Sequence, residues 1–376
     1  MKKIVNVGWS IGNFCNAKCN HCYSWKSRKE SIDMLTNTEI NIILDKLISY
    51  GVETVNFGGN EPIFTHGADV AKTKLPYIIE TLYKHNVACG ITTNGYTALY
   101  LYENHPNVFH MINDWDFSLD APCREDHDQN RNMEGAFNNV LKGLELCTRF
   151  NRPKSIVIAG MISNLDTNTL KDFIDLAREY SAELRINLLK PIEEHHFKMF
   201  PDAGQVYKAF QYLFDETELI TLSEPFLACQ AGIEMIGCPC GEYSFRIRSK
   251  QNGRVPITPC VYMELDGGDL LTQSIEEIVE SNAFVEFCKR KNDIPHECRE
   301  MECEYLKICR GGCTARSFLM YGNYDSKDPY CPVAVVDVAN KYLKGHSLEK
   351  IEDGSIRVHE NYLCTWIGKP VKKGGN

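Results

Sequence analysis

Short apolar runs alternate with longer amphipathic stretches through the first half of the chain. Runs typical of buried strands lie at residues 4–11, 53–57, 87–92, 115–119, 155–162 and 184–189. Stretches with the helical spacing of apolar residues separate them, at residues 36–50, 75–85, 136–150 and 170–180. Strands that alternate with helices in this way are typical of βα units with a parallel sheet. The pattern therefore predicts an α/β fold, a partial (βα)6 barrel of parallel strands.

The pattern changes in the second half of the chain. After a predicted helix at 204–214, the sequence from Cys229 to Cys331 is dense in Cys, Gly and Pro, and one longer helix is predicted at 274–291. Such a segment has a small apolar core, so we expect bound metal to stabilise it. We predict a barrel core at 1–225, a small loop-rich domain at 226–340 and a C-terminal tail at 341–376. We expect a short helix at 335–343, across the boundary of that tail, and disorder at 372–376.

A cluster of cysteines follows the first predicted strand. Cys15, Cys19 and Cys22 have the spacing CxxxCxxC, and a loop of this length can place three thiolates on one side. Thiolates select iron–sulfur centres, zinc or Cu(I), and a structural zinc site takes four ligands. The neighbouring His21 is awkwardly placed to be a fourth ligand. The spacing favours a four-iron cluster with one iron free to bind a substrate or cofactor.

Further polar or small residues follow the next predicted strands. Gly58, Asn94 and Asp120 each come directly after a strand, as Cys15 does. In folds of this type the site lies at the carboxyl ends of the parallel strands. We expect these four residues to share one rim.

The composition and net charge limit the partners and the cellular location that we expect for the protein. The chain has 376 residues, of which 43% are hydrophobic and 24% charged, and its net charge is -9. The acidic balance argues against a nucleic-acid partner. No apolar run approaches the ~18 residues of a membrane span, and polar residues interrupt the would-be signal peptide. We predict a cytoplasmic protein without a membrane partner, in which clustered thiols are metal ligands rather than disulfides.

A second group of cysteines lies in the loop-rich segment. Cys298, Cys303, Cys309 and Cys313 are separated by four, five and three residues, and Cys331 follows seventeen residues on. Upstream are Cys238, Cys240 and Cys260. The alternatives are a zinc ribbon or scattered thiols. Eight cysteines at these spacings fit two iron–sulfur clusters better than one four-ligand zinc site.

The first cysteine motif resembles the signature of radical S-adenosylmethionine (radical SAM) enzymes, CxxxCx(aromatic)C after a first strand, with His21 at the aromatic position. Gly58-Gly59-Asn60-Glu61-Pro62 resembles the Gly-Gly-Glu-Pro turn of that family, in which Asn60 replaces a glycine or is inserted. Glycines allow the backbone to approach a ligand closely.

Two later strand ends, at 92–95 and 118–120, are also similar to cofactor-binding positions of that family. The resemblance implies that these residues contact S-adenosylmethionine: His21, Gly58, Gly59, Glu61, Asn94, Ser118, Asp120, Ser163 and Arg185. A turn or capping role is the alternative for each of the polar ones.

The second cysteine group resembles the SPASM extension of radical SAM enzymes, which binds two auxiliary 4Fe–4S clusters. The resemblance assigns an outer cluster to Cys298, Cys303, Cys309 and Cys331. It assigns an inner cluster to Cys260, Cys313 and one or both of Cys238 and Cys240. Three 4Fe–4S clusters are thus implied. The remaining cysteines are expected to be packed residues, namely Cys89, Cys123, Cys147, Cys229, Cys288 and Cys364.

The resemblance implies an enzyme that cleaves S-adenosylmethionine and abstracts hydrogen from a peptide or protein, as a ribosomal-peptide maturase. It also implies a one-electron reductant such as flavodoxin or ferredoxin. Since only 14 residues precede Cys15, leader binding would use the core or a separate protein. Alternatives are a sulfatase-maturating type of enzyme, disfavoured because Val261 replaces an Asp after Pro259-Cys260, and a small-molecule or tetrapyrrole dehydrogenase. A non-enzymatic alternative is an iron–sulfur electron carrier or a zinc-stabilised module.

Overall fold

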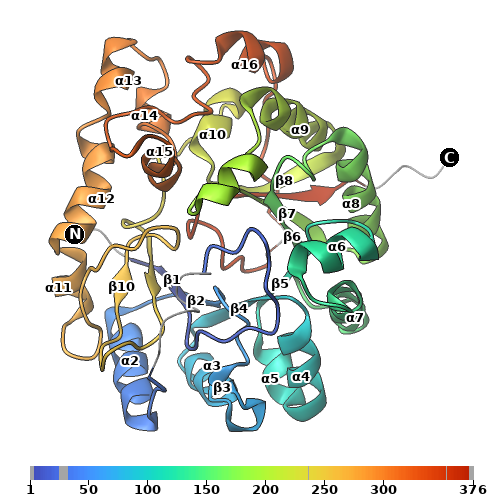
Figure 1. Ribbon diagram of the computed structural model, residues 1–376, viewed down its shortest axis with the longest axis vertical. Helices are drawn as coiled ribbons and strands as arrows, with labels where there is room; N and C mark the ends of the chain where they lie inside the picture. Colours follow the sequence, from blue (N-terminus) through green and yellow to red (C-terminus); the bar gives the residue numbers. More distant parts are fainter. Residues whose placement is uncertain (1–3, 25–32, 236, 353, 372–376) are drawn as a thin grey trace.

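Six parallel strands form the centre of the molecule, as the apolar runs predict. The computed structural model describes residues 4–24, 33–235, 237–352 and 354–371 (Figure 1). The six strands lie side by side in chain order and pair in parallel: β1 (Asn6–Trp9), β2 (Thr54–Phe57), β4 (Ala88–Thr93), β5 (Asp114–Ser118), β6 (Lys154–Gly160) and β7 (Glu183–Leu188). The predicted α/β fold with a partial barrel of parallel strands is therefore confirmed.

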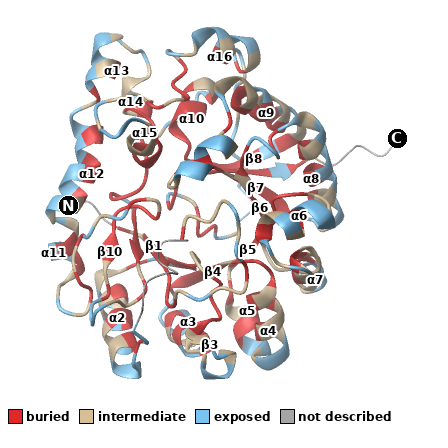
Figure 2. Cartoon of the chain, in the orientation of Figure 1, coloured by how far each residue is buried: buried red, intermediate tan, exposed pale blue. Residues whose placement is uncertain are grey.

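Helices cover the outer face of these strands (Figure 1). They are α2 (Asn37–Tyr50), α3 (Leu75–Lys84), α4 (Tyr96–Asn104), α5 (Pro106–Met111), α6 (Arg124–Arg131), α7 (Ala136–Arg149), α8 (Thr167–Glu179) and α9 (Ala203–Glu216). Each longer helix buries its apolar side against the sheet and exposes its polar side (Figure 2). α2 begins at a capping box, in which Thr36 and Glu39 satisfy each other's backbone N–H groups. The helices leave the carboxyl ends of the strands open at one end of the barrel.

Four strands that the sequence pattern did not predict extend the sheet at its two edges. β9 (Ser244–Ile247) pairs in parallel with β1, and β10 (Ile257–Thr258) pairs antiparallel with β9. β11 (Trp366–Pro370) lies antiparallel between β7 and β8 (Thr217–Leu222). Residues predicted to be a separate domain and a tail thus contribute to the barrel sheet. A further short strand is β3 (Thr65–Ala68), followed by a 3-10 turn at Val70–Lys72.

The loop-rich half contains short helices and turns that lie beside the barrel (Figure 1). They are α10 (Pro225–Ala231), α11 (Ile275–Val279), α12 (Asn282–Asn292), α13 (His296–Glu300), α14 (Leu306–Cys309), α15 (Thr314–Tyr321) and α16 (Val336–Tyr342), with a 3-10 turn at Glu194–Met199 before them. The single helix predicted at 274–291 is divided in two because Ser281 takes an extended conformation and starts α12 as its N-cap. Residues 372–376, predicted to be disordered, lie outside the described residues.

A segment near the C-terminus, residues 357–365, runs through the interior of the barrel and is called the crossing segment below. The backbone N–H of Val358 donates to Asp114 on β5 at 3.1 Å. Further along, Ser244 on β9 donates to the carbonyl of Tyr362 at 2.6 Å, and Thr365 donates to Ile186 on β7 at 3.2 Å. The segment therefore contacts strands toward both edges of the sheet, β9 and β7, before it enters β11. Among the described residues no helix is long and apolar enough to cross a bilayer.

Candidate active site

One large cavity lies at the carboxyl ends of the parallel strands. It encloses about 1150 Å³ including its open mouth. The loop after β1, the strand ends, β9 and the crossing segment all contribute side chains to its wall. The cavity therefore gathers side chains from distant parts of the chain at one end of the barrel.

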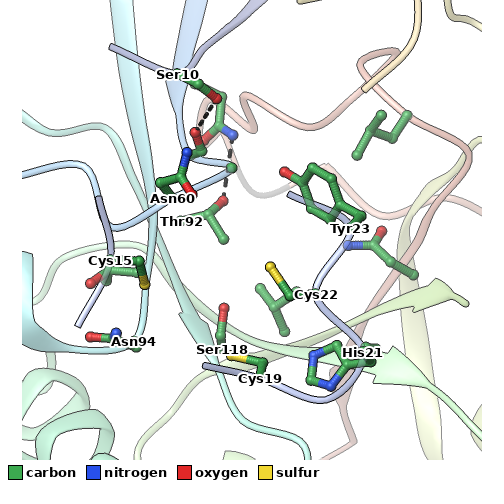
Figure 3. A pocket seen from close by; sticks show the side chains of 18 of the residues that line it. Ser10, Cys15, Cys19, His21, Cys22, Tyr23, Asn60, Thr92, Asn94 and Ser118 are labelled. Atoms are coloured by element: carbon green, nitrogen blue, oxygen red, sulfur yellow. Dashed lines mark hydrogen bonds between the residues drawn. The ribbon is translucent and has the colours of Figure 1, made fainter. Parts of the chain in front are cut away.

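The three cysteines of the first motif face this cavity. Figure 3 shows Cys15, Cys19 and Cys22 around its open space, with His21 at the edge. All three thiols are partly accessible, and Arg131 Nη1 lies 3.6 Å from Cys19 Sγ, where it can stabilise a thiolate. His21 Nε2 lies 3.4 Å from Asp120 instead of joining the cysteines as a fourth donor. Three thiols without a fourth protein donor fit a four-iron cluster that keeps one iron open, and not a closed zinc site.

A buried ion pair fixes the loop that carries these cysteines. Arg131 Nη2, at the end of α6, lies 2.5 Å from Asp120 Oδ2, just after β5. Although burial opposes it, the Arg131 guanidinium together with His21 holds the pKa of Asp120 below its ordinary value. Asp120 Oδ1 also accepts from the Ala159 backbone at 3.2 Å. Asp120 is therefore ionised and joins two strand ends to the cysteine loop.

His127 makes a hydrogen bond with the backbone of Asp120, and this bond depends on pH. Its Nδ1 accepts the backbone N–H of Asp120 at 3.1 Å, and burial lowers its pKa from 6.5 to about 4. The folded state thus binds this proton less readily than the unfolded chain. The stabilisation is complete above the ordinary pKa of 6.5 and is lost as the pH falls toward 4.

We therefore expect wild type to lose stability between pH 6.5 and 4, with His127 responsible for about 2–3 kcal/mol. His127→Asn keeps an acceptor near Nδ1 but cannot be protonated, so its unfolding free energy should fall less over this range. Urea unfolding of both proteins at several pH values measures the difference. Identical pH profiles would contradict the assignment.

The turn at residues 58–62 packs against the segment before Cys15. Gly59 has a left-handed φ of 90°, and a Cβ there would lie 2.3 Å from Ser10 Oγ, so only glycine fits. Asn60 Nδ2 donates to the carbonyl of Gly12 at 3.1 Å. The residue that departs from the Gly-Gly-Glu-Pro pattern thus ties the turn to the cysteine loop. Gly58, Gly59, Asn60 and Glu61 all line the cavity, and Figure 3 shows Asn60 there.

Glu61 is buried and receives hydrogen bonds from β4 and α4. Asn94 N donates to Oε2 and Thr97 N to Oε1, both at 2.9 Å, and the hydroxyls of Thr93 and Thr97 also donate to Oε1. Burial raises the pKa of Glu61, although these donors oppose the shift. The carboxylate therefore holds the turn against the third strand end.

We expect Glu61→Gln to destabilise the protein by about 1–3 kcal/mol, because one amide N–H₂ would then face buried donors. Glu103→Gln, on the exposed side of α4, is the matched control and should change stability by less than about 0.5 kcal/mol. Urea unfolding checks both values. Equal stabilities of the two variants would show that the Glu61 contacts contribute nothing.

A second ion network lies deeper in the barrel. Arg185 Nη1 on β7 donates to Asp116 on β5 at 2.9 Å, and His359 Nδ1 lies 2.7 Å from the same carboxylate. Asp114, Asp116 and His359 bring ligand-type atoms within 4.8 Å of one another. His359, followed by Arg185 and Arg357, lowers the pKa of Asp116 despite the burial of this carboxylate. We interpret this group as a set of ion pairs that holds the crossing segment, through His359, to the carboxylates of β5.

A buried ammonium group faces the cavity from the end of β7. Lys190 is 2% exposed, and its Nζ has no hydrogen-bond partner among the described residues. It lies 5.0 Å from the centre of the Tyr262 ring. Burial opposes its charge, but Tyr262 and Cys313 raise the pKa of Lys190 overall. A charged group with unused donors can bind an anionic group of a molecule in the cavity.

The cysteines of the second group lie in two separate places. Cys298, Cys303, Cys309 and Cys331 line one small cavity, as predicted for the outer cluster. Gly312 has a φ of 83°, and a Cβ there would lie 2.4 Å from Asp328. Asp328 in turn accepts the backbone N–H of Cys313 at 2.8 Å, so the turn fixes the direction of the chain between the two cysteine sites.

The predicted inner-cluster cysteines pack together. Cys238, Cys240, Cys260 and Cys313 are all buried in one side-chain cluster, which also contains Tyr362. Cys364, predicted to be a packed residue, belongs to the same cluster. Cys229, also predicted to be a packed residue, interacts with Cys309.

The structure brings nearly all of the predicted cofactor residues to the main cavity. His21, Asn94, Ser118, Asp120 and Arg185 line it together with the turn at 58–62. Ser163 is exposed and does not line the cavity; its neighbour Asn164 is buried and donates to Asp120 O at 3.1 Å. Sequence reasoning did not identify other charged or aromatic lining residues, because no motif marks them: Tyr23, Arg131, Lys190, Arg246, Tyr262 and His359.

Comparison with known proteins agrees with this geometry. The family model of the radical SAM superfamily matches residues 9–180. The chain is 23% identical over 354 residues to an AdoMet-dependent heme synthase of Oleidesulfovibrio alaskensis, covering 86% of each chain. It is 25% identical over 350 residues to mycofactocin maturase MftC of Mycobacterium ulcerans, covering 87% of each.

Solved structures share the fold. AdoMet-bound anSMEcpe has a TM-score of 0.68 at 17% identity and covers 89% of this chain and 92% of its own. Streptococcus suis SuiB has a TM-score of 0.64 at 15% identity and covers 88% and 77%. Residues 9–180 therefore form a radical SAM domain, the domain of enzymes that use S-adenosylmethionine and a 4Fe–4S cluster.

Proposed function

We propose that this enzyme abstracts a hydrogen atom from a peptide substrate and leads it to oxidation or cross-link formation, as a ribosomal-peptide maturase does. The observation that carries the proposal is one cavity lined by three cysteines, by polar residues at the strand ends, and by Tyr262, Tyr362 and Leu363, which pack with the inner cysteines. When bound, the cluster and S-adenosylmethionine supply a 5′-deoxyadenosyl radical and methionine on one-electron reduction.

Different residues of the chain would hold the cluster and the S-adenosylmethionine. Cys15, Cys19 and Cys22 would hold the cluster, and Arg131 would stabilise the Cys19 thiolate. The turn at 58–62 would hold the amino end of S-adenosylmethionine by its backbone. The further contacts that the proposal assigns to the cofactor come from residues that line the cavity: His21, Asn94, Ser118, Asp120 and Arg185.

Two auxiliary 4Fe–4S clusters belong to the proposal, held in a SPASM-like region within residues 226–340. The cavity lined by Cys298, Cys303, Cys309 and Cys331 supports the outer one. The buried packing of Cys238, Cys240, Cys260 and Cys313 supports the inner one. These clusters would accept an electron from the substrate after hydrogen abstraction, which favours oxidation or cross-linking. A reducing cytoplasm, with flavodoxin or ferredoxin as electron donor, would keep all these thiols available.

The peptide substrate is supported by similarity to mycofactocin maturase MftC and by the shared fold with SuiB, which has been solved with its precursor peptide SuiA. The cavity is open at its mouth and extends past the cofactor residues to Lys190 and Tyr262, so an extended chain can enter it. Recognition of a leader sequence would use the core or a separate leader-binding protein.

A tetrapyrrole substrate is the second candidate, favoured by the similarity to AdoMet-dependent heme synthase. The same Lys190 ammonium would then bind a propionate group, whereas in a peptide it would bind a carboxylate. The sulfatase-maturating alternative has the shared fold with anSMEcpe in its favour, but Val261 follows Cys260 where that group has an Asp.

Deuterium transfer distinguishes these substrates. Short peptides encoded by neighbouring genes, made with deuterated residues, are incubated anaerobically with enzyme, S-adenosylmethionine and dithionite. We expect deuterium in 5′-deoxyadenosine and a peptide changed in mass. Transfer from deuterated iron–coproporphyrin, with none from any peptide, would favour the tetrapyrrole function and contradict the peptide proposal.

Iron content tests the auxiliary clusters separately. Anaerobic reconstitution should give about 12 iron atoms per chain, four for each of three clusters. About four iron atoms, or zinc in their place, would refute the auxiliary clusters and leave the radical SAM assignment intact.

A further inference from the structure

Cys364 lies at a fixed position in the crossing segment. It is 3% exposed, and both of its neighbours are bonded to Ser223. Ser223 Oγ donates to the carbonyl of Leu363 at 2.6 Å, and Ser223 N donates to the carbonyl of Thr365 at 2.9 Å. The backbone on each side of Cys364 is therefore held in place.

The side chain of Cys364 lies in the same buried cluster as the inner cysteines. The Cys364 thiol interacts with the thiols of Cys238 and Cys313. On the other side of the group, the Cys240 thiol interacts with those of Cys238 and Cys260. Five of the six buried cysteines of this side-chain cluster, from four separate parts of the chain, thus have thiols that interact with one another; the sixth, Cys288, lies beside Gly241, and all cysteines of the protein are free thiols.

We propose that Cys364 is a ligand of the inner cluster, together with Cys260, Cys313 and one cysteine of the Cys238–Cys240 pair. A four-iron cube has four ligand positions, so five thiols exceed its needs by one. Cys238 and Cys240 are only two residues apart and compete for neighbouring positions. Cys240 Sγ also has another partner, the carbonyl of Tyr362 at 3.5 Å, which leaves Cys238 next to Cys364.

Ligation by Cys364 would join the inner cluster to the wall of the main cavity. The crossing segment contributes His359, Tyr362 and Leu363 to that wall, and Leu363 directly precedes Cys364. A cluster bound there is therefore one residue away from the surface that a bound substrate contacts. This proposal rests on the auxiliary clusters proposed above and goes beyond them by naming a ligand outside the cysteine-rich segment.

The test compares single variants after anaerobic reconstitution, by iron content and by electron paramagnetic resonance of the reduced clusters. Cys313→Ala serves as the reference for a damaged inner cluster and Cys303→Ala for a damaged outer cluster. Cys364→Ala should lose between about one and four of about 12 iron atoms per chain, and its spectrum should match that of Cys313→Ala. Cys147→Ala, a buried thiol of α7, is the control and should match wild type.

Cys364→Ser provides a second test in case Cys364→Ala fails to fold, because serine has nearly the same shape as cysteine and is a poorer ligand. It should keep the wild-type fold by circular dichroism and shift the inner-cluster signal. A wild-type iron content and spectrum in Cys364→Ala would overturn the proposal. If wild type itself holds only about four iron atoms, the auxiliary clusters fail instead, and the two failures are distinguishable.

Discussion

Replacing Cys15, Cys19 and Cys22 together by alanine is expected to abolish the formation of 5′-deoxyadenosine. These thiols line the cavity, and no fourth cysteine contributes to its wall. Without them the radical-generating cluster has no protein ligand, so product should fall to the level of an enzyme-free control. Liquid chromatography of the anaerobic reaction measures it.

The iron content of the same triple variant shows whether only the radical-generating cluster is lost. It should fall from about 12 to about eight atoms per chain, because the auxiliary cysteines are untouched. Cys147→Ala removes a thiol whose pKa burial raises to about 12, and it should retain both iron and activity. A triple variant that still cleaves the cofactor would show that the radical is generated elsewhere.

Replacing Arg316 by methionine should cause the largest loss of stability of any single substitution considered. Arg316 is fully buried and holds two buried carboxylates, with Nη2 2.6 Å from Glu224 and 2.7 Å from Asp328. Removing it leaves both without their cation, which costs about 3–5 kcal/mol. Burial already raises the pKa of Glu224, so this group would take up a proton in the variant.

The control for Arg316 is an exposed pair of the same type. Arg254 Nη1 lies 2.8 Å from Asp266, with both side chains about half exposed, so Arg254→Met should cost under about 1 kcal/mol. Urea unfolding of the reconstituted proteins measures both variants. A loss below about 1 kcal/mol in Arg316→Met would show that the buried network does not hold the cysteine-rich region to the barrel.

The barrel could be predicted from the sequence because its strands are buried on both faces. Such strands read as continuous apolar runs, and each of the six predicted runs overlaps an observed parallel strand within a few residues. β11 was not predicted, because Trp366–Pro370 is short, contains Gly and Pro, and pairs with strands far away in the sequence. Its position depends on long-range pairing, which local pattern does not record.

The site was predictable where it rests on motifs and not where it rests on packing. The CxxxCxxC loop and the strand ends reach one cavity because parallel strands place their carboxyl ends on one rim. Arg131 enters from α6 and carries no motif of its own. Ser163 and Asn164 are adjacent polar residues after the same strand, and only the fold decides that Asn164 turns inward.

The second cysteine group shows the same limit. Spacing grouped Cys298, Cys303, Cys309 and Cys331, and these do line one cavity. Spacing could not include Cys364, which is separated from Cys331 by more than thirty residues and returns through the barrel interior. Contacts made by a crossing segment are invisible to any local pattern.

The most direct test of the radical SAM mechanism uses wild-type enzyme alone. Reconstituted protein is incubated anaerobically with S-adenosylmethionine and dithionite, and both products are quantified. We predict methionine and 5′-deoxyadenosine in equal amounts, dependent on the reductant. A protein loaded with about 12 iron atoms per chain that releases neither product would contradict the account.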